Sequence, residues 1–298
     1  MGLLNQTAGL VAFVRAAESG SFSAAARLVG TTPSAVSKGI GRLEAELGAT
    51  LFYRSTRSLG LTPDGQALFD RVAPLLRGIE DAADVLQTAG GARGILRVSM
   101  PGEIGRLLMA AITSVFLAEH EGVELDLSLA DRHADVIREG HDLVFRVGTV
   151  RDSGLRSRTL ARLDMVLVAS PGFVAHRGNP ASFAQLHALP FVRYLQRGRA
   201  LPITFADGTT LHPRGRIGLD TGAGLRAAAL NGMGVVLLMK CTVQDDLDRG
   251  DLVEVMTQER LPRLPFQALH AFGRQVPARA RRFMDFVERE MQRITRRA

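Results

Sequence analysis

The sequence predicts a chain of two parts, an N-terminal all-α segment with one short β-ribbon and a larger C-terminal α/β domain. Apolar residues recur at helical spacing through the first ninety residues, whereas short apolar strands alternate with helices after that point. Ala89, Gly90 and Gly91 lie between the two patterns and are typical of a flexible joint. The length of 298 residues, of which 46% are hydrophobic, is sufficient for more than one core.

Residues 22–47 have the pattern of a helix-turn-helix. A short helix over 24–29, capped by Ser21 or Ser23, follows a first helix and ends at Gly30. Three successive alanines at its start allow another helix to approach closely.

The third helix is expected to begin after Thr32, a suitable N-cap, because Pro33 then takes the first helical position, where its missing N–H costs nothing. One face of this helix carries a predicted buried stripe: Val36, Ile40, Leu43 and Leu47. The opposite face then presents Ser34, Lys38, Gly41 and Arg42. Short hydroxyl and basic side chains suit a DNA major groove. By spacing alone, a helical hairpin with a merely solvated polar face fits equally well.

A ribbon over 51–61 and a long helix from Thr62 to about residue 88 complete the N-terminal segment. Pro74 falls inside that helix, where it should kink the axis or lie where a lost hydrogen bond is tolerated. The apolar stripe of the helix is longer than a DNA-binding domain of about 60 residues needs for cover, so we expect it to pair two chains.

The C-terminal part alternates strands and helices. Strands are expected at 95–100, 123–129, 143–147, 165–169, 191–195, 216–219, 235–238 and 266–272. Helices are expected at 103–118, 225–230, 243–247 and 278–294. Asp207 and Gly208 predict a hairpin turn.

Several function classes are disfavoured. No nucleophile elbow, P-loop or Gly-x-Gly-x-x-Gly occurs, so we expect no catalysis and no cofactor. Asp131, His133 and Asp135 would align as metal ligands only on a straight strand, and a turn into a helix fits better. The single cysteine, Cys241, excludes an internal disulfide and is expected to be a packed thiol, with a redox sensor as the alternative.

The predicted cellular location and the net charge say less about function than the motifs do. The N-terminus has no secretory pattern, and no apolar run approaches the roughly 20 residues of a membrane span, so we expect a cytoplasmic protein with no membrane partner. The net charge of +7 is weak evidence for DNA binding, because residues 260–298 hold ten arginines against three acids, whereas residues 1–62 have a net charge of only +3.

Several spaced motifs resemble those of the LysR-type transcriptional regulators. They are F-x-x-A-A-E-S-G-S-F-S-A-A-A at 13–26, P-S-A-V-S-K at 33–38, I-x-R-L-E-x-x-L-G at 40–48, L-F-x-R at 51–54, L-T-x-x-G at 61–65, E-G-H-D-L-V-F-R-V-G at 139–148 and V-A-S-P at 168–171. The resemblance therefore covers essentially the whole length.

This resemblance implies a winged helix-turn-helix over 1–62, a linker dimerisation helix over 63–90, and an effector domain over 91–298 made of two lobes like a periplasmic binding protein. Lobe I would span about 91–162 and 267–298, and lobe II about 163–266. The implied function is a sequence-specific DNA-binding transcription regulator controlled by a small molecule bound between the lobes. The alternative is a solute-binding receptor module without DNA function. Implied partners are a two-fold related promoter site, further copies of the chain as a homodimer or homotetramer, and RNA polymerase.

The resemblance also assigns DNA contacts by position. The candidates in the helix-turn-helix are Ser23, Arg27, Thr31, Thr32, Pro33, Ser34, Ser37, Lys38 and Arg42, and those in the wing are Arg54, Thr56 and Arg57. Thr32 stands where a glutamine is common in the family, and a shorter side chain is expected to relax base choice. Gly39 and Gly41 each cost the third helix about 1 kcal/mol relative to alanine, so this helix is expected to gain order on DNA.

In a two-lobed α/β domain, ligands bind at the carboxyl ends of strands, where helix N-termini offer free N–H groups. The effector candidates at such places are Ser99, Met100, Pro101, Gly102, Arg146, Tyr194 and Thr221. Other roles fit several of them: Ser99 and Thr221 as helix caps, Tyr194 as packing, and Arg146 as the ion-pair partner of Asp142. Helix N-termini and one arginine favour a small, flat anion, with a neutral heteroaromatic or no small ligand as alternatives. The negative charge of Asp220 would repel an anionic ligand unless its carboxylate caps the helix that follows.

Overall fold

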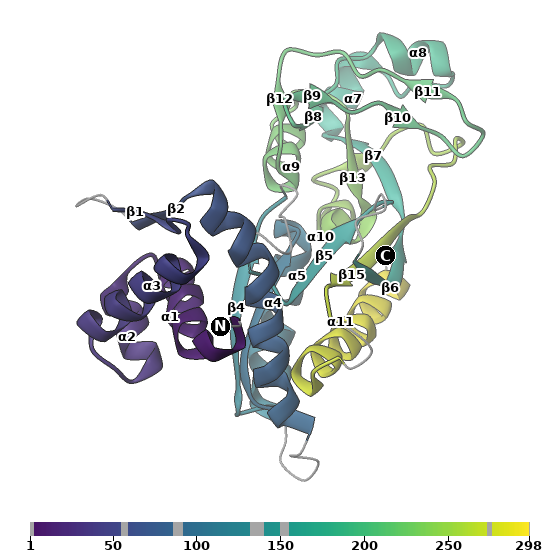
Figure 1. The fold of residues 1–298 in the computed structure, drawn as a ribbon. Helices are drawn as coiled ribbons and strands as arrows, with labels where there is room; N and C mark the ends of the chain where they lie inside the picture. Colours follow the sequence, from purple (N-terminus) through teal and green to yellow (C-terminus); the bar gives the residue numbers. More distant parts are fainter. Residues whose placement is uncertain are drawn as a thin grey trace. The chain divides into compact units, whose positions relative to one another are not determined.

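The computed structural model describes residues 3–54, 59–85, 92–131, 140–149, 155–272 and 276–297. The chain divides near residue 90 into two compact units (Figure 1). No described helix is long and apolar enough to cross a membrane.

The N-terminal unit is helical apart from one hairpin. Its elements in chain order are η1 (Leu3–Gln6), α1 (Thr7–Ser19), α2 (Phe22–Val29), α3 (Pro33–Leu47), β1 (Phe52–Arg54), β2 (Leu59–Leu61) and α4 (Pro63–Val85). The strands β1 and β2 pair in antiparallel register. The predicted ribbon is confirmed, and α4 contains Pro74 as expected. Residues 86–88, the predicted end of the long helix, lie outside the described residues.

Local capping chemistry explains the boundaries of these helices. The Thr32 hydroxyl accepts a hydrogen bond from the Ala35 N–H at 3.2 Å, which confirms the predicted cap. Of the two candidate caps for α2, Ser21 is the one used, and its hydroxyl accepts from the Ala24 N–H at 3.4 Å. The helix therefore starts at Phe22, two residues before the predicted start.

The core of the N-terminal unit forms where α1, α3, β1 and α4 meet. Phe13 is fully buried, and its ring centroid lies 5.5 Å from that of Phe52 and 6.5 Å from that of Phe69. The predicted stripe of α3 is confirmed: Val36, Ile40 and Leu43 are buried and Leu47 packs at the edge. α1 approaches α3 closely at Gly9, where an added Cβ would lie 3.2 Å from the Gly39 carbonyl oxygen.

A five-stranded mixed sheet forms the first lobe of the C-terminal unit, in the order β4-β3-β5-β15-β6. β3 (Gly94–Met100) runs parallel to β4 (Val123–Leu129) and β5 (Leu143–Val147), whereas β15 (Leu264–His270) is antiparallel to β5 and β6 (Arg156–Leu163). β6 was not predicted from the sequence. This edge strand buries only Leu160 and Leu163, so it lacks the apolar run of a central strand.

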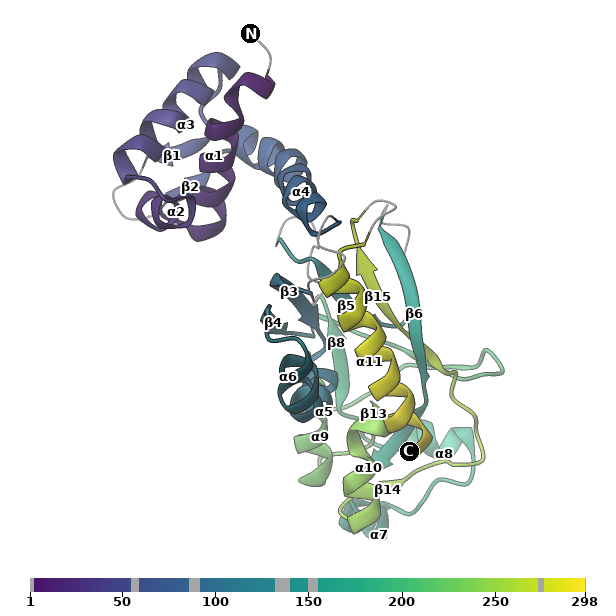
Figure 2. The ribbon, with the colours of Figure 1, turned by 90° about the horizontal axis from the view of Figure 1, so that it is seen from below.

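Helices cover one face of this sheet. α5 (Gly102–Ala111), η2 (Ile112–Phe116, one π-helical turn) and α6 (Leu117–Glu119) together form the predicted helix. The second covering helix is α11 (Ala278–Arg297), which lies along the sheet in Figure 2. Their apolar faces share one core with Leu96, Val98 and Met100 of β3.

The second lobe contains smaller sheets. β7 (Met165–Ala169) lies between β13 (Val236–Met239) and β14 (Val253–Glu254), both antiparallel to it. β8 (Arg193–Gln196) pairs with β9 (Arg199–Ala200) and with β12 (Gly218–Leu219). β10 (Ile203–Thr204) and β11 (Thr210–Leu211) form the predicted hairpin, with Gly208 at a φ of 87°.

The helices of the second lobe are α7 (Pro171–Arg177), α8 (Phe183–Ala188), α9 (Gly222–Leu230) and α10 (Lys240–Arg249). α7 and α8 were not predicted from the sequence, because they are too short to show a helical period. The predicted starts of α9 and α10 are three residues late, because the first turns of these helices contain glycine or polar residues. The predicted strand at 216–219 is reduced to β12.

Candidate functional site

The polar face of α3 is open to solvent. The candidate residues Ser23, Arg27, Thr31, Thr32, Pro33, Ser34, Ser37, Lys38 and Arg42 are all exposed. Ser34, Lys38 and Arg42 stand four residues apart, so they form one row along the helix, opposite the buried Val36 and Leu43. In the wing, Arg54 ends β1, but its side chain lies outside the described residues, as do Thr56 and Arg57. The arrangement places hydroxyls and two cations on one rigid helix face.

On β3, Ser99 faces away from the core. Val98 and Met100 lie in the core of the first lobe, and successive side chains of a strand point to opposite faces. Ser99 is fully buried, yet its hydroxyl has no hydrogen-bond partner among the described residues. It therefore caps no helix in this structure. A contact of Met100 with an effector would have to come from its main chain.

Arg146 occupies the same face of the sheet as Ser99. Val144 pairs directly with Ser99, and Arg146 follows it by two residues on β5. Arg146 is only 8% exposed, and its guanidinium donates to the Phe145 carbonyl oxygen at 2.9 Å. Asp142, the predicted partner of Arg146, accepts a hydrogen bond from the Arg97 N–H at 2.9 Å.

Tyr194 of β8 lies within electrostatic range of this face. Burial raises the pKa of Tyr194, the charges of Asp131 and Asp220 raise it further, and the charge of Arg146 lowers it. The two candidates Arg146 and Tyr194, from different lobes, are thus within electrostatic range of each other. Thr221 caps α9, since its hydroxyl accepts from the Gly224 N–H at 3.2 Å.

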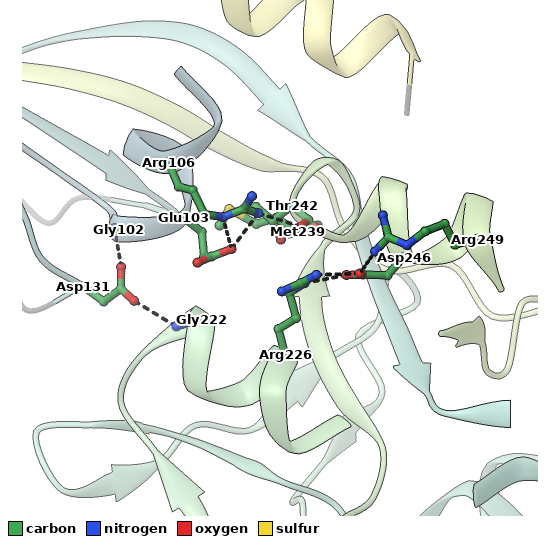
Figure 3. Close-up of polar contacts among 10 residues, drawn as sticks. All are labelled: Gly102, Glu103, Arg106, Asp131, Gly222, Arg226, Met239, Thr242, Asp246 and Arg249. Carbon is green, nitrogen blue, oxygen red and sulfur yellow. Dashed lines mark hydrogen bonds and ion pairs between the residues drawn. The ribbon is translucent and has the colours of Figure 1, made fainter. Parts of the chain in front are cut away.

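Asp131 connects the first turns of two helices (Figure 3). One carboxylate oxygen accepts from the Gly102 N–H of α5 at 2.8 Å, and the other accepts from the Gly222 N–H of α9 at 2.9 Å. The sequence pattern pointed to Asp131 only as a possible metal ligand, and this role was not predicted. A usable signal was present, because Asp131 follows β4, whose carboxyl end lies beside that of β3 in a parallel pair. His133 and Asp135 lie outside the described residues, and the described part of the chain holds no cluster of three metal-ligating side chains.

A second polar network joins α9 to α10. Asp246, only 1% exposed, accepts hydrogen bonds from Arg226 at 2.5 Å and from Arg249 at 2.6 Å (Figure 3). Nearby, Arg106 of α5 pairs with Glu103 at 3.1 Å and donates to the Thr242 carbonyl oxygen at 3.2 Å. These contacts fix α5 and α9 against α10.

Cys241 lies in the core of the first lobe and is 7% exposed. Burial raises the pKa of its thiol to about 11. Since the thiolate is the reactive form, this environment favours the packed thiol over the redox sensor.

Family models match both units of the chain. Residues 8–66 match the bacterial regulatory helix-turn-helix protein, lysR family, and residues 89–292 match the LysR substrate binding domain. Because the helix-turn-helix model matches, the alternative of a solute-binding module without DNA function is set aside.

Characterised relatives and solved structures agree with these matches. The chain is 31% identical over 291 residues to the HTH-type transcriptional regulator PtxR of Pseudomonas aeruginosa, covering 95% of this chain and 92% of that protein. It is 30% identical to the regulator CrgA of Neisseria meningitidis serogroup B, covering 95% of this chain and 96% of that protein. The structure of CrgA, a LysR-type transcriptional regulator, has a TM-score of 0.62 at 29% identity, over 96% of this chain and 98% of that one. ArgP from Mycobacterium tuberculosis has a TM-score of 0.67 at 22% identity and shares the fold.

The predicted architecture, a helix-turn-helix unit followed by an α/β effector domain, is thereby confirmed. The chain belongs to the LysR family and is a DNA-binding transcription regulator whose activity is controlled by a small molecule.

Proposed function

We propose that α3 is the recognition helix and enters the major groove of promoter DNA. The observation that carries this proposal is the exposed row of Ser34, Lys38 and Arg42 opposite a fully packed apolar stripe. Their side chains can reach base edges and phosphates without disturbing the core. The relatives are transcription regulators, and we propose no catalytic role.

A second part of the proposal concerns α4. Leu75 and Ile79 are both 67% exposed in the single chain, although Phe69, Val72 and Ala73 of the same helix are buried in the N-terminal core. Large apolar side chains one turn apart on a long helix favour pairing with a second copy. Two chains paired through α4 would present two copies of α3 to a two-fold related DNA site. Association of two such dimers, and contact with RNA polymerase, follow as further expectations.

The effector, in this proposal, binds on the face of the first-lobe sheet that carries Ser99 and Arg146, with Tyr194 as the wall from the second lobe. The buried Ser99 hydroxyl supports this placement, because a buried polar group without a partner costs free energy that a ligand can recover. A flat molecule with a hydrogen-bonding group directed at Ser99 fits these side chains.

DNA binding is tested by mobility shift of the full chain with fragments taken upstream of its own gene. A shift that is lost when Ser34, Lys38 and Arg42 are replaced by alanine supports the proposal. Absence of a shift at low salt with every upstream fragment would contradict it.

Effector binding is tested by calorimetric titration with two flat probes, benzoate as an anion and nicotinamide as a neutral heteroaromatic. Binding of either probe by the wild type, weakened in both Ser99→Ala and Arg146→Ala, would support the site. Equal affinity of wild type and both variants for a bound probe would remove these residues from it.

A further inference from the structure

One carboxylate, that of Asp131, satisfies the first N–H groups of two helices at once. Its two oxygens accept from Gly102 at 2.8 Å and from Gly222 at 2.9 Å. The first N–H groups of a helix lack partners within the helix and lie at the positive end of its dipole. The structure therefore contains a bidentate carboxylate position, which the chain fills with its own side chain (Figure 3).

Little room remains for a second carboxylate at this position. An added Cβ on Gly222 would lie 3.0 Å from Cγ of Glu103, so the start of α9 packs directly on the first turn of α5. Glu103 is itself 6% exposed, and its carboxylate pairs with Arg106 at 3.1 Å. An incoming carboxylate would have to displace Asp131 or sit next to its like charge in a partly buried site.

Ser99 has unused hydrogen-bonding capacity near the start of α5. Its buried hydroxyl has no hydrogen-bond partner among the described residues, and it lies on β3 three residues before Gly102. The hydroxyl of Ser99 on the sheet is thus unfilled, whereas the first N–H of each of the two helices is already bonded to Asp131.

We propose that Asp131 is a specificity-determining residue, which fills the carboxylate position between α5 and α9 and thereby excludes small carboxylates from it. This inference rests on the effector site proposed above. In the wild type an effector would bond to the sheet face rather than to the paired helix N-termini. Removal of the Asp131 side chain should convert the position into a binding site for a free carboxylate.

The test is chemical rescue of the full chain by formate. Thermal unfolding is followed for wild type and Asp131→Ala with formate or chloride up to about 100 mM at equal ionic strength. We expect the variant to unfold about 5 °C lower in chloride, because two charge-assisted hydrogen bonds are lost. Formate should restore the unfolding midpoint of the variant in a saturable way. Half-saturation is expected at about millimolar concentration or above, because a ligand of three heavy atoms cannot bind much more tightly than that.

Two further variants control the result. Asp126→Ala removes the same charge from β4 at an exposed side chain, 3.7 Å from Arg97, and should show no formate effect beyond that of wild type. Asp131→Asn fills the space but keeps an acceptor for only one of the two N–H groups, so it should be destabilised and insensitive to formate.

The proposal is overturned if Asp131→Ala unfolds at the wild-type temperature, or if formate stabilises it no more than it stabilises Asp126→Ala. If Asp131→Ala does not fold, Asp131→Asn decides, and a wild-type midpoint for that variant overturns the proposal. Since unfolding is measured without effector or DNA, failure here leaves the effector site standing. Failure of that site would instead appear as probe affinities unchanged in the Ser99 and Arg146 variants.

Discussion

The two units of this regulator differ in where they keep their polar chemistry. In the N-terminal unit the row of Ser34, Lys38 and Arg42, which we propose contacts DNA, is exposed, and the core beneath it is apolar. In the C-terminal unit two of the polar groups described above are buried: Ser99 is 0% exposed and Asp246 is 1% exposed. Exposed polar groups can be replaced with little effect on folding, whereas buried ones contribute to folding and to ligand binding together. Substitutions should therefore separate binding from stability only in the N-terminal unit.

The largest effect is expected where the N-terminal unit leaves apolar side chains exposed. Leu75→Glu combined with Ile79→Glu should raise the dimer dissociation constant by at least about 1000-fold, since each buried Leu or Ile contributes roughly 1.5–3 kcal/mol and each occurs twice in a dimer. Sedimentation equilibrium measures this constant. The matched control, Leu75→Met with Ile79→Leu, keeps the surface apolar and should remain dimeric. A stable dimer of the double glutamate variant would show that α4 does not pair the chains.

The next effect should come from the most buried carboxylate of the second lobe. Asp246→Ala leaves Arg226 and Arg249 without their shared acceptor, and we expect the free energy of unfolding to fall by about 3 kcal/mol. Urea denaturation of the full chain measures it. Asp251→Ala, which removes a half-exposed partner of Arg249, serves as the control and should cost less than about 1 kcal/mol. Equal losses in the two variants would show that burial does not govern the effect.

The same difference explains what the sequence could predict. Thr32 and Ser21 bond to N–H groups three residues away, so the start of each helix follows from a few adjacent residues. Asp131 and Gly222 are 91 residues apart, and no local pattern pairs them. The sequence predicts helix N-termini after Pro101 and after Thr221 with an anionic effector bound at them, because nothing local indicates that the Asp131 carboxylate, distant in the sequence from Gly222, occupies them. β6 was not predicted for a related reason, since an edge strand with a polar face has no apolar run.

A smaller effect is expected for the exposed residues of α3 in the N-terminal unit. Lys38→Ala and Arg42→Ala should each weaken promoter binding. If the contact is to a base, the loss should be about 1–3 kcal/mol; if it is to a phosphate, the slope of the logarithm of the association constant against the logarithm of the salt concentration should fall in magnitude by about one. Fluorescence anisotropy at several salt concentrations distinguishes the two. The midpoint of thermal unfolding should not change, since neither side chain contributes to the core. Arg199→Ala, an exposed arginine of the C-terminal unit, is the control. Wild-type affinity in both recognition-helix variants would contradict a role for α3 in the groove.

The smallest effect concerns His270, a buried titratable group in β15. Its side chain is 5% exposed, its Nδ1 has no hydrogen-bond partner among the described residues, and it pairs in register with Arg156. Burial, and then the charge of Arg156, lower the pKa of His270 below its ordinary value of 6.5.

Above pH 6.5 the imidazole is neutral in both folded and unfolded chains, so the pKa difference has no effect on stability there. As the pH falls below 6.5, the unfolded chain takes up the proton first, and the free energy of unfolding decreases until the folded chain is protonated as well. His270→Gln should therefore lose less stability than wild type between about pH 7.5 and about pH 5, as measured by urea denaturation at both values. His212→Gln replaces an exposed histidine of the same unit and supplies the matched comparison. If the pH dependence of His270→Gln equals that of wild type, burial of this imidazole has no energetic consequence, and the contrast between the two units would not extend to titration.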